Sequence, residues 1–201
     1  MLIGLIRHGL TDWNAAGRIQ GRSDIPLNEE GRRQAHRLAK RLKGEPYRWD
    51  FAISSGLLRA RETAQIIASA LDIPLLEADE RLAERGFGQV EGMTQAEREE
   101  RFGTDWNSLD IGQEKLEALE ERALAFMDDI ETKHPDRNVL VISHGGLLAQ
   151  LYLALYEGRY TERIGNLALT VLEKEGELWE PLLYNCTKHL LEEPSGDRRT
   201  L

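Results

Sequence analysis

The sequence lacks the features that define several large classes of protein. It contains one cysteine, Cys186, so it can form neither an internal disulfide nor a cysteine-based metal cluster. No segment approaches the roughly 20 consecutive apolar residues of a membrane span. The first apolar run, residues 1–6, ends at Arg7 and is too short for the core of a secretory signal. We therefore expect a cytoplasmic protein with no membrane partner.

Positive charge is also scarce. The chain has 26 Lys and Arg against 35 Asp and Glu, a formal net charge of −9. A general nucleic-acid binder presents a basic face to phosphates, so we expect no nucleic-acid partner, although a local basic pocket is compatible with this balance. The sequence has no P-loop and no G-x-S-x-G turn, and its Gly86, Gly88 and Gly92 miss the spacing of a dinucleotide-binding loop by one residue.

The composition is that of one soluble globular domain. Hydrophobic residues make up 41% and charged residues 30% of 201 residues, a length that suits a single domain with its own core. Residues 1–191 are predicted to form this domain, and residues 192–201 a disordered tail.

Apolar runs alternate with amphipathic segments along the chain. Strands are predicted at 2–6, 51–53 and 138–143, with a hairpin over 167–173 and 177–183. Helices are predicted at 28–42, 57–71 and 146–156, and residues 93–135 are predicted to be a helical insert. This alternation predicts an α/β fold, a three-layer α/β/α sandwich with a mostly parallel central sheet and the insert over the site.

Two histidines follow predicted buried strands in the same way. His8 and His144 are each preceded by one polar residue and followed by glycine. Ligands of open α/β sheets bind beyond the carboxyl ends of the strands, so both imidazoles are expected in one crevice. Arg7 and Arg59 are expected at the same edge, where two guanidinium groups suit a tetrahedral dianion. A neutral imidazole is a competent nucleophile toward phosphorus.

Such a site also needs a proton donor for the leaving group. Glu84 is the candidate, because it lies in a glycine-rich stretch that can approach a ligand closely. A carboxyl group beside a bound dianion holds its proton more tightly, which suits a general acid near neutral pH.

These residues resemble the signature motifs of the histidine phosphatase superfamily, which has the phosphoglycerate mutase-like fold. Five motifs occur in order, and the resemblance covers nearly the whole chain. They are R-H-G-L-T at 7–11, the stretch from Asn14 through 24–28 to 34–35, R-A-x-x-T-A at 59–64, L-x-E-x-x-F-G-x-x-E-G at 82–92 and S-H-G-G at 143–146. Leu10 departs from the Glu or Gln that is usual there, and residues 112–115 depart from the usual turn before the long helix.

The resemblance implies a role for each site residue. His8 would attack the phosphoryl group, Arg7, Arg59 and His144 would stabilise its charge, and Glu84 would protonate the leaving oxygen. No metal and no cofactor are implied, because the arginines supply the positive charge. The residues expected to bind phosphate or substrate are Asn14, Gln20, Gly21, Arg85 and Gly145.

Within the family, the stretch at 87–92 looks most like the broad-specificity and α-ribazole phosphatase branches. This favours a phosphatase that acts on a small phosphorylated metabolite. Two alternatives stay open: a cofactor-dependent phosphoglycerate mutase, whose insert usually carries a basic R-R pair, and a protein that only binds a phosphorylated ligand.

The insert gives little information about the substrate. The run 97–101 is expected to be a solvated helix face. Phe102 and Trp106 fit two roles equally well, as a wall for the leaving group or as packing between the insert and the core. Of the remaining histidines, His36 and His134 are expected to face solvent and His189 to be structural. The strand after Gly165 could pair with a second copy, which would give a homodimer.

Overall fold

The computed structural model describes residues 1–191, so the predicted disordered tail at 192–201 lies outside the described residues. A five-stranded sheet forms its centre, in the order β2-β3-β1-β4-β5. Parallel pairing joins β1 to β3 and β2 to β3, whereas β4 pairs antiparallel with both β1 and β5. The strands are β1 (Leu2–Arg7), β2 (Phe51–Ser54), β3 (Val139–Ser143), β4 (Leu169–Glu175) and β5 (Leu178–Cys186).

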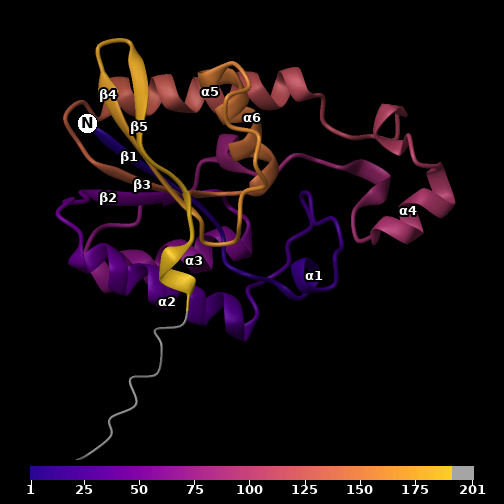
Figure 1. Ribbon diagram of the computed structural model, residues 1–201, viewed down its shortest axis with the longest axis horizontal. Helices are drawn as coiled ribbons and strands as arrows, with labels where there is room; N and C mark the ends of the chain where they lie inside the picture. Colours follow the sequence, from indigo (N-terminus) through magenta and orange to yellow (C-terminus); the bar gives the residue numbers. More distant parts are fainter. Residues whose placement is uncertain (192–201) are drawn as a thin grey trace, which may run out of the picture.

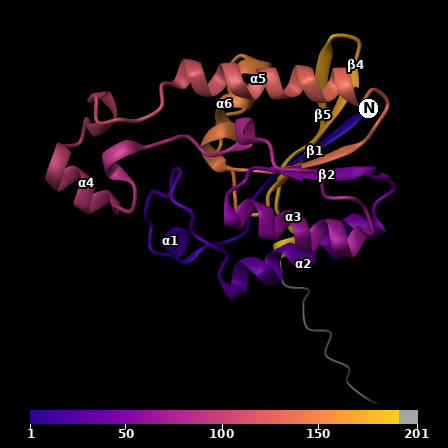
Figure 2. The same ribbon diagram turned by 180° about the vertical axis from the view of Figure 1, so that it is seen from behind.

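Helices cover both faces of the sheet, as the alternating pattern predicts (Figure 1). Buried side chains of α2 (Glu29–Gly44) and α3 (Leu58–Leu71) pack against one face. Those of α5 (Leu116–Lys133) and α6 (Gly145–Tyr156) pack against the other. Figure 2 shows the same three layers from behind. The predicted α/β/α sandwich is therefore confirmed, with its parallel part formed by β2, β3 and β1.

The parallel strands are continuous apolar runs because both of their faces are covered. Every residue of β2 and β3 is buried, as are the four central residues of β1. At the start of α2, the Asn28 side chain accepts a 2.9 Å hydrogen bond from the Gly31 backbone amide, which is the N-cap that the sequence predicts.

Only part of the predicted insert projects from the sandwich. The projecting segment includes α4 (Gln95–Phe102) and a short 3-10 helix, η3 (Trp106–Ser108), and it lies beyond the end of the sheet in Figure 1. In contrast, α5 buries Leu119, Phe126 and Ile130 in the core. The segment 93–135 thus divides near residue 115 into a projecting lobe and a core helix.

The remaining elements are short. They are α1 (Asp12–Ala15) and the 3-10 helices η1 (Glu80–Leu82), η2 (Gly88–Val90) and η4 (Lys188–Leu190). The final hairpin turns at 176–177, one residue later than the predicted turn at 175–176. Among the described residues, no helix is long and apolar enough to cross a membrane.

Candidate active site

The sheet brings the two predicted histidines together. Because β1 and β3 pair in parallel with Arg7 opposite Ser143, the residues that follow both strands leave the same edge side by side. The His8 backbone amide donates to the Ser143 carbonyl at 2.9 Å, and the ring centroids of His8 and His144 are 5.1 Å apart. Both side chains are at most 1% exposed. The two histidines that follow strands in the same sequence pattern therefore belong to one site.

Hydrogen bonds around His8 assign its tautomer. Its Nδ1 lies 2.7 Å from the Gly9 carbonyl oxygen, which can only accept, so Nδ1 carries the proton. The lone pair of Nε2 accepts a long 3.3 Å hydrogen bond from Arg59 Nε. Burial holds the pKa of His8 well below its usual value, and the nearby Arg7 and Arg59 charges lower it further. His8 is therefore neutral at pH 7, with an unprotonated Nε2.

Arg59 is held by the loop that follows α1. It lies in the first turn of α3, fully buried, and donates to the carbonyls of Ser23 at 2.7 Å and Gly21 at 2.8 Å. Burial lowers its pKa to about 10, against the opposing effect of Glu84 and other carboxylates, so it stays charged at neutral pH. Its guanidinium is thus fixed beside the His8 ring.

Arg7 is the last residue of β1 and directly precedes His8. Its Nη1 donates to the Ile164 carbonyl at 2.7 Å, while its buried Nε has no hydrogen-bond partner among the described residues. Burial also lowers the pKa of Arg7, and the Glu84 carboxylate opposes that shift. An unpartnered guanidinium nitrogen beside a nucleophile is suited to receive a phosphate oxygen.

His144 has one ring nitrogen engaged and one without a partner. Its Nε2 lies 2.7 Å from the Ser55 hydroxyl, which follows β2, whereas its buried Nδ1 makes no hydrogen bond to a described residue. Burial is the main reason that the pKa of His144 lies well below its usual value, and the charges of neighbouring groups add to this. If Ser55 donates to Nε2, then Nδ1 carries the proton and can donate to a ligand.

Glu84 lies at the N-terminus of α6. Its Oε1 accepts from the backbone amides of Arg85 at 2.8 Å and Leu147 at 3.1 Å, and its Oε2 accepts from Gly146 at 3.1 Å. The side chain is only 9% exposed. A Cβ atom at Gly146 would meet Oε1 at 2.5 Å, so a glycine is needed where the carboxylate approaches the helix. These contacts fix Glu84 beside the histidines.

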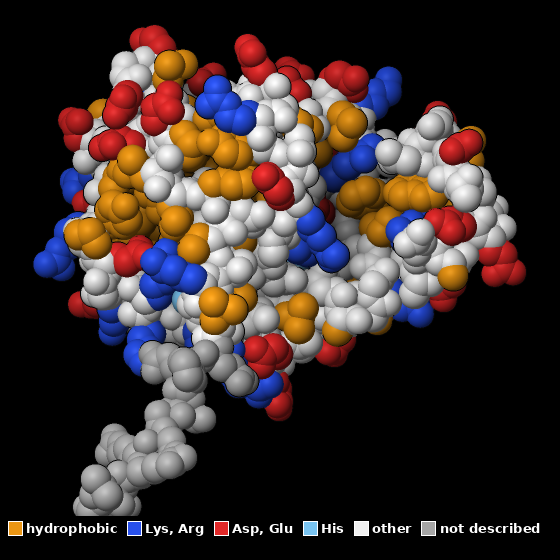
Figure 3. Space-filling view, viewed as in Figure 1, with side chains coloured by type: hydrophobic (Ala, Val, Ile, Leu, Met, Phe, Trp, Pro, Cys, Tyr) orange, Lys and Arg blue, Asp and Glu red, His pale blue; other side chains and the backbone are white. Residues whose placement is uncertain are grey.

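A cavity of about 250 Å³ opens onto these groups. Figure 3 shows the molecule hollowed between its main body and the projecting lobe, with Lys and Arg side chains at the rim. The predicted residues that line the cavity are Arg7, His8, Asn14, Gln20, Gly21 and Glu84. Arg59 and His144 are not in the cavity lining, but Arg59 contacts His8 Nε2 and the His144 ring lies beside the His8 ring.

Two predicted binding residues do not line this cavity. The Arg85 Nε donates to the Glu114 carbonyl at 2.9 Å, and its guanidinium lies over the Phe87 ring. A Cβ atom at Gly145 would lie 3.3 Å from Nε of the Arg7 side chain. The structure therefore gives Arg85 a role in holding the insert, and gives Gly145 one in leaving room for Arg7.

Several residues at the site were not among the predicted site residues. Asn166 Nδ2 donates to the His8 carbonyl at 3.0 Å, which fixes the backbone of the nucleophile, and nothing in the sequence singles it out. Glu91 accepts from the backbone amides of Arg22, Ser23 and Phe87 and so joins two loops of the site. Glu91 belongs to the motif at 82–92, and this is the feature of the sequence that could have identified it as a site residue.

Arg98 corrects a prediction. The run 97–101 was expected to be a solvated face, but Arg98 lines the cavity together with Arg163. Its guanidinium lies 5.2 Å from the centre of the Trp106 ring, and Arg101 stacks on Phe102 in the same way. The two aromatic residues therefore pack within the projecting lobe, and neither lines the cavity.

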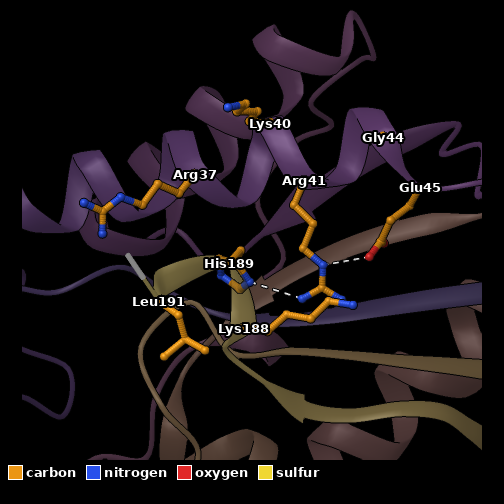
Figure 4. Close-up of a pocket in the computed structure, with 8 residues that line it drawn as sticks. All are labelled: Arg37, Lys40, Arg41, Gly44, Glu45, Lys188, His189 and Leu191. Atoms are coloured by element: carbon orange, nitrogen blue, oxygen red, sulfur yellow. Dashed lines mark hydrogen bonds and ion pairs between the residues drawn. The ribbon is translucent and has the colours of Figure 1, made fainter. Parts of the chain in front are cut away.

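A larger cavity of about 720 Å³ lies elsewhere, between the C-terminal half of α2 and η4 (Figure 4). Its Arg41 is held by Glu45 at 2.7 Å and by His189 at 3.2 Å, and Figure 4 marks no contact between these groups and Arg37 or Lys40. The groups in this cavity do not converge, so the smaller cavity is the candidate active site.

The other histidines do not gather into a further site. His36 is exposed, as predicted, and His189 contacts Arg41. The expectation that His134 faces solvent is wrong in part, because its ring packs against Phe51 with the centroids 4.7 Å apart and is half-buried. Within residues 1–191, no group of three or more His, Cys, Asp or Glu is placed to hold a metal ion.

A neutral imidazole near two buried guanidinium groups is an arrangement that suits a phosphate dianion. The chain belongs to the histidine phosphatase superfamily (branch 1), whose family model matches residues 3–187. The family predicted from the motifs is thus confirmed.

Individual relatives agree with this assignment. The chain is 34% identical to a Bacillus subtilis (strain 168) protein described as the uncharacterized phosphatase PhoE, over 92% of this chain and 95% of that protein. It is 35% identical to a metal-independent phosphoserine phosphatase of Arabidopsis thaliana, over 94% and 82%. The solved structure of Bacillus stearothermophilus YhfR superposes with a TM-score of 0.87 at 29% identity, covering 94% of this chain and 99% of that one. These relatives support a phosphatase.

Proposed function

We propose that the protein is a metal-independent phosphatase that hydrolyses a small phosphorylated metabolite through a phosphohistidine intermediate. The state of His8 carries this proposal: a buried neutral imidazole with its proton on Nδ1, its Nε2 lone pair in contact with Arg59, and the charge of Arg7 nearby. Fixed cations near the nucleophile supply the charge that a metal ion would otherwise provide. The name of the Arabidopsis relative is consistent with catalysis without a metal.

In the first step, His8 Nε2 attacks phosphorus and the bond between phosphorus and the leaving oxygen breaks. Arg7, Arg59 and the His144 Nδ1–H stabilise the charge on the equatorial oxygens. Glu84, in its acid form, gives its proton to the leaving oxygen, so that a neutral alcohol departs. The products of this step are the alcohol, a phosphorylated His8 and the Glu84 carboxylate.

In the second step, water takes the place of the alcohol. The Glu84 carboxylate accepts a proton from the water as its oxygen attacks phosphorus, and the bond to His8 Nε2 breaks. Inorganic phosphate leaves, and both His8 and Glu84 return to their starting states. The net reaction consumes one water for each phosphomonoester.

Hydrolysis is proposed over mutase chemistry because residues 87–92 resemble the phosphatase branches and the insert has no basic R-R pair. Relatives of both names occur, phosphatases and phosphoglycerate mutases. We also propose that the protein acts in the cytoplasm on a small-molecule substrate, without a nucleic-acid, membrane or cofactor partner. Because one relative is named a phosphoserine phosphatase, phosphoserine belongs in the first substrate panel.

The test is hydrolysis of p-nitrophenyl phosphate in EDTA by the wild type and the His8→Ala variant. We expect turnover that survives EDTA and disappears in the variant, whose fold is checked by circular dichroism. Turnover that needs a divalent metal, or that persists in a folded variant, would overturn the mechanism. If the wild type shows no turnover, assays with phosphoglycerate separate a mutase from a protein that only binds phosphorylated ligands.

A further inference from the structure

The backbone of Glu84 lies in a segment without regular secondary structure. Residues 84–87 connect η1 to η2 and belong to neither a helix nor a strand. The Glu84 carboxylate accepts from amides of α6, but its reach toward a ligand also depends on where its backbone stands. A displacement of about 1 Å at a reacting group can cost about 10²-fold in rate. A contact that fixes this backbone therefore bears on proton transfer.

Arg122, in α5, supplies such a contact. Its Nη1 donates to the Arg81 carbonyl at 2.6 Å, and its Nη2 donates to the Glu84 carbonyl at 3.2 Å. One planar guanidinium thus spans two carbonyls of the same segment, which a single ammonium group does not match. The Arg122 side chain is 15% exposed and does not line the cavity that contains His8. It therefore contacts the backbone of Glu84 and not the space for the ligand.

Glu114 orients Arg122 through an ion pair. Its Oε1 accepts from Arg122 Nε at 2.7 Å, and its Oε2 accepts from Arg122 Nη2 at 3.0 Å and from the Gly86 backbone amide at 3.1 Å. Burial raises the pKa of Glu114, but the hydrogen bonds from Arg122 and Gly86 outweigh this effect and hold the pKa below its usual value. The charged pair thus holds the backbone on both sides of Glu84, at Arg81 and at Gly86.

We propose that Arg122, oriented by Glu114, is a positioning residue for proton transfer by Glu84. It fixes the Glu84 backbone so that the carboxyl group reaches the leaving oxygen in the first step and the attacking water in the second. This inference rests on the proposed phosphatase function and adds to it a residue outside the cavity. Loss of Arg122 should then slow each substrate according to its need for a proton donor, whereas a role in stability alone would slow all substrates alike.

The experiment compares phenyl phosphate with p-nitrophenyl phosphate, two substrates of similar size. Phenolate is the poorer leaving group of the two and gains more from protonation. For Arg122→Met we expect kcat/KM to fall about 10- to 100-fold for phenyl phosphate and much less for p-nitrophenyl phosphate. Arg122→Lys keeps the charge but not the planar fork, so it should restore only part of the loss.

Arg41→Met is the matched control. Arg41 also forms a 2.7 Å ion pair, with Glu45, and its side chain is 10% exposed, but it lies at the larger cavity and contacts no residue of the site. The same substitution there should leave the ratio of kcat/KM for the two substrates unchanged.

Two double variants separate positioning from folding. Glu114→Gln with Arg122→Met leaves no buried charge without its partner, so it should fold even where Arg122→Met alone does not, and it should change the ratio in the same direction. In a Glu84→Gln background, Arg122→Met should leave the ratio unchanged, because the group that it positions is absent. Circular dichroism checks the fold of each variant.

The inference is overturned if the folded Arg122 variants slow both substrates equally, or if Arg122→Met still changes the ratio in the Glu84→Gln background. Failure of the phosphatase proposal is seen separately and first, as the absence of turnover of both substrates by the wild type, and it would refute this inference as well.

Discussion

Replacing Glu84 by Gln separates its two proposed roles, because leaving groups differ in their need for a proton. An alkoxide must be protonated as it leaves, whereas p-nitrophenolate departs without a proton. General acid catalysis contributes about 10²- to 10⁴-fold. We therefore expect Glu84→Gln to lower kcat/KM for an alkyl phosphate by that factor, and for p-nitrophenyl phosphate by less than about tenfold.

The second proposed role of Glu84, as the base that activates water, is tested by the time course of p-nitrophenol release. Without a base to activate water, hydrolysis of phosphorylated His8 becomes slow, so stopped-flow absorbance should record a burst of p-nitrophenol close to one equivalent per enzyme. A slow steady rate should follow. Equal losses for both substrates, with no burst, would refute the assignment of Glu84 as acid and base.

The contacts of Glu84 also indicate how much Glu84→Gln should lower the free energy of unfolding. The amide oxygen of Gln can replace Oε1, which accepts from Arg85 and Leu147, but its NH₂ group then faces the Gly146 N–H instead of accepting from it. One buried donor loses its acceptor, which costs about 1–3 kcal/mol of the free energy of unfolding. Chemical denaturation measures this cost, and kinetics are then recorded where the variant is folded.

Three further perturbations test the surroundings of the histidines. Ser55→Ala removes the hydroxyl 2.7 Å from His144 Nε2, so kcat/KM should fall up to about tenfold; an unchanged value would show that this contact does not orient the ring. Gly146→Ala places a Cβ 2.5 Å from the Glu84 Oε1 position, so activity on alkyl phosphates should fall at least tenfold in steady-state assays, and full activity would contradict the fixed position of the carboxylate. The lowered pKa values of His8 and His144 mean that only the unfolded chain takes up their protons near pH 6, so the free energy of unfolding should fall by about 1.2 kcal/mol per histidine between pH 7 and pH 5.5. Urea denaturation at both pH values should show about 1.2 kcal/mol less of this loss in His8→Ala, and an identical loss in both proteins would contradict a neutral buried His8.

The positions of His8 and His144 could be predicted from the sequence because each depends on the local pattern of a buried strand followed by a polar residue, a histidine and a glycine. A buried strand fixes the direction in which the next residue leaves the sheet, and parallel pairing brings equivalent ends together. His8 and His144 therefore meet once β1 and β3 are neighbours with Arg7 opposite Ser143. The helix that begins after Asn28 is likewise set by a local cap.

The parts that could not be predicted depend on contacts between distant segments. Asn166 holds the His8 carbonyl across 158 residues, and no local pattern specifies such a contact. In α4, all five residues of the run 97–101 are charged, so periodicity does not indicate which side faces the cavity. Only the packing of Arg98 on Trp106 and the position of the projecting lobe beyond the sheet decide it.

The central claim is that His8 carries the phosphoryl group between substrate and water, and rapid-quench trapping tests it most directly. The protein is mixed with ³²P-labelled phosphomonoester in EDTA, quenched in alkali, and digested for mass spectrometry. We predict a transient label, stable to alkali and labile to acid, on the peptide that contains His8. Absence of label during turnover, or label on another residue, would contradict the account.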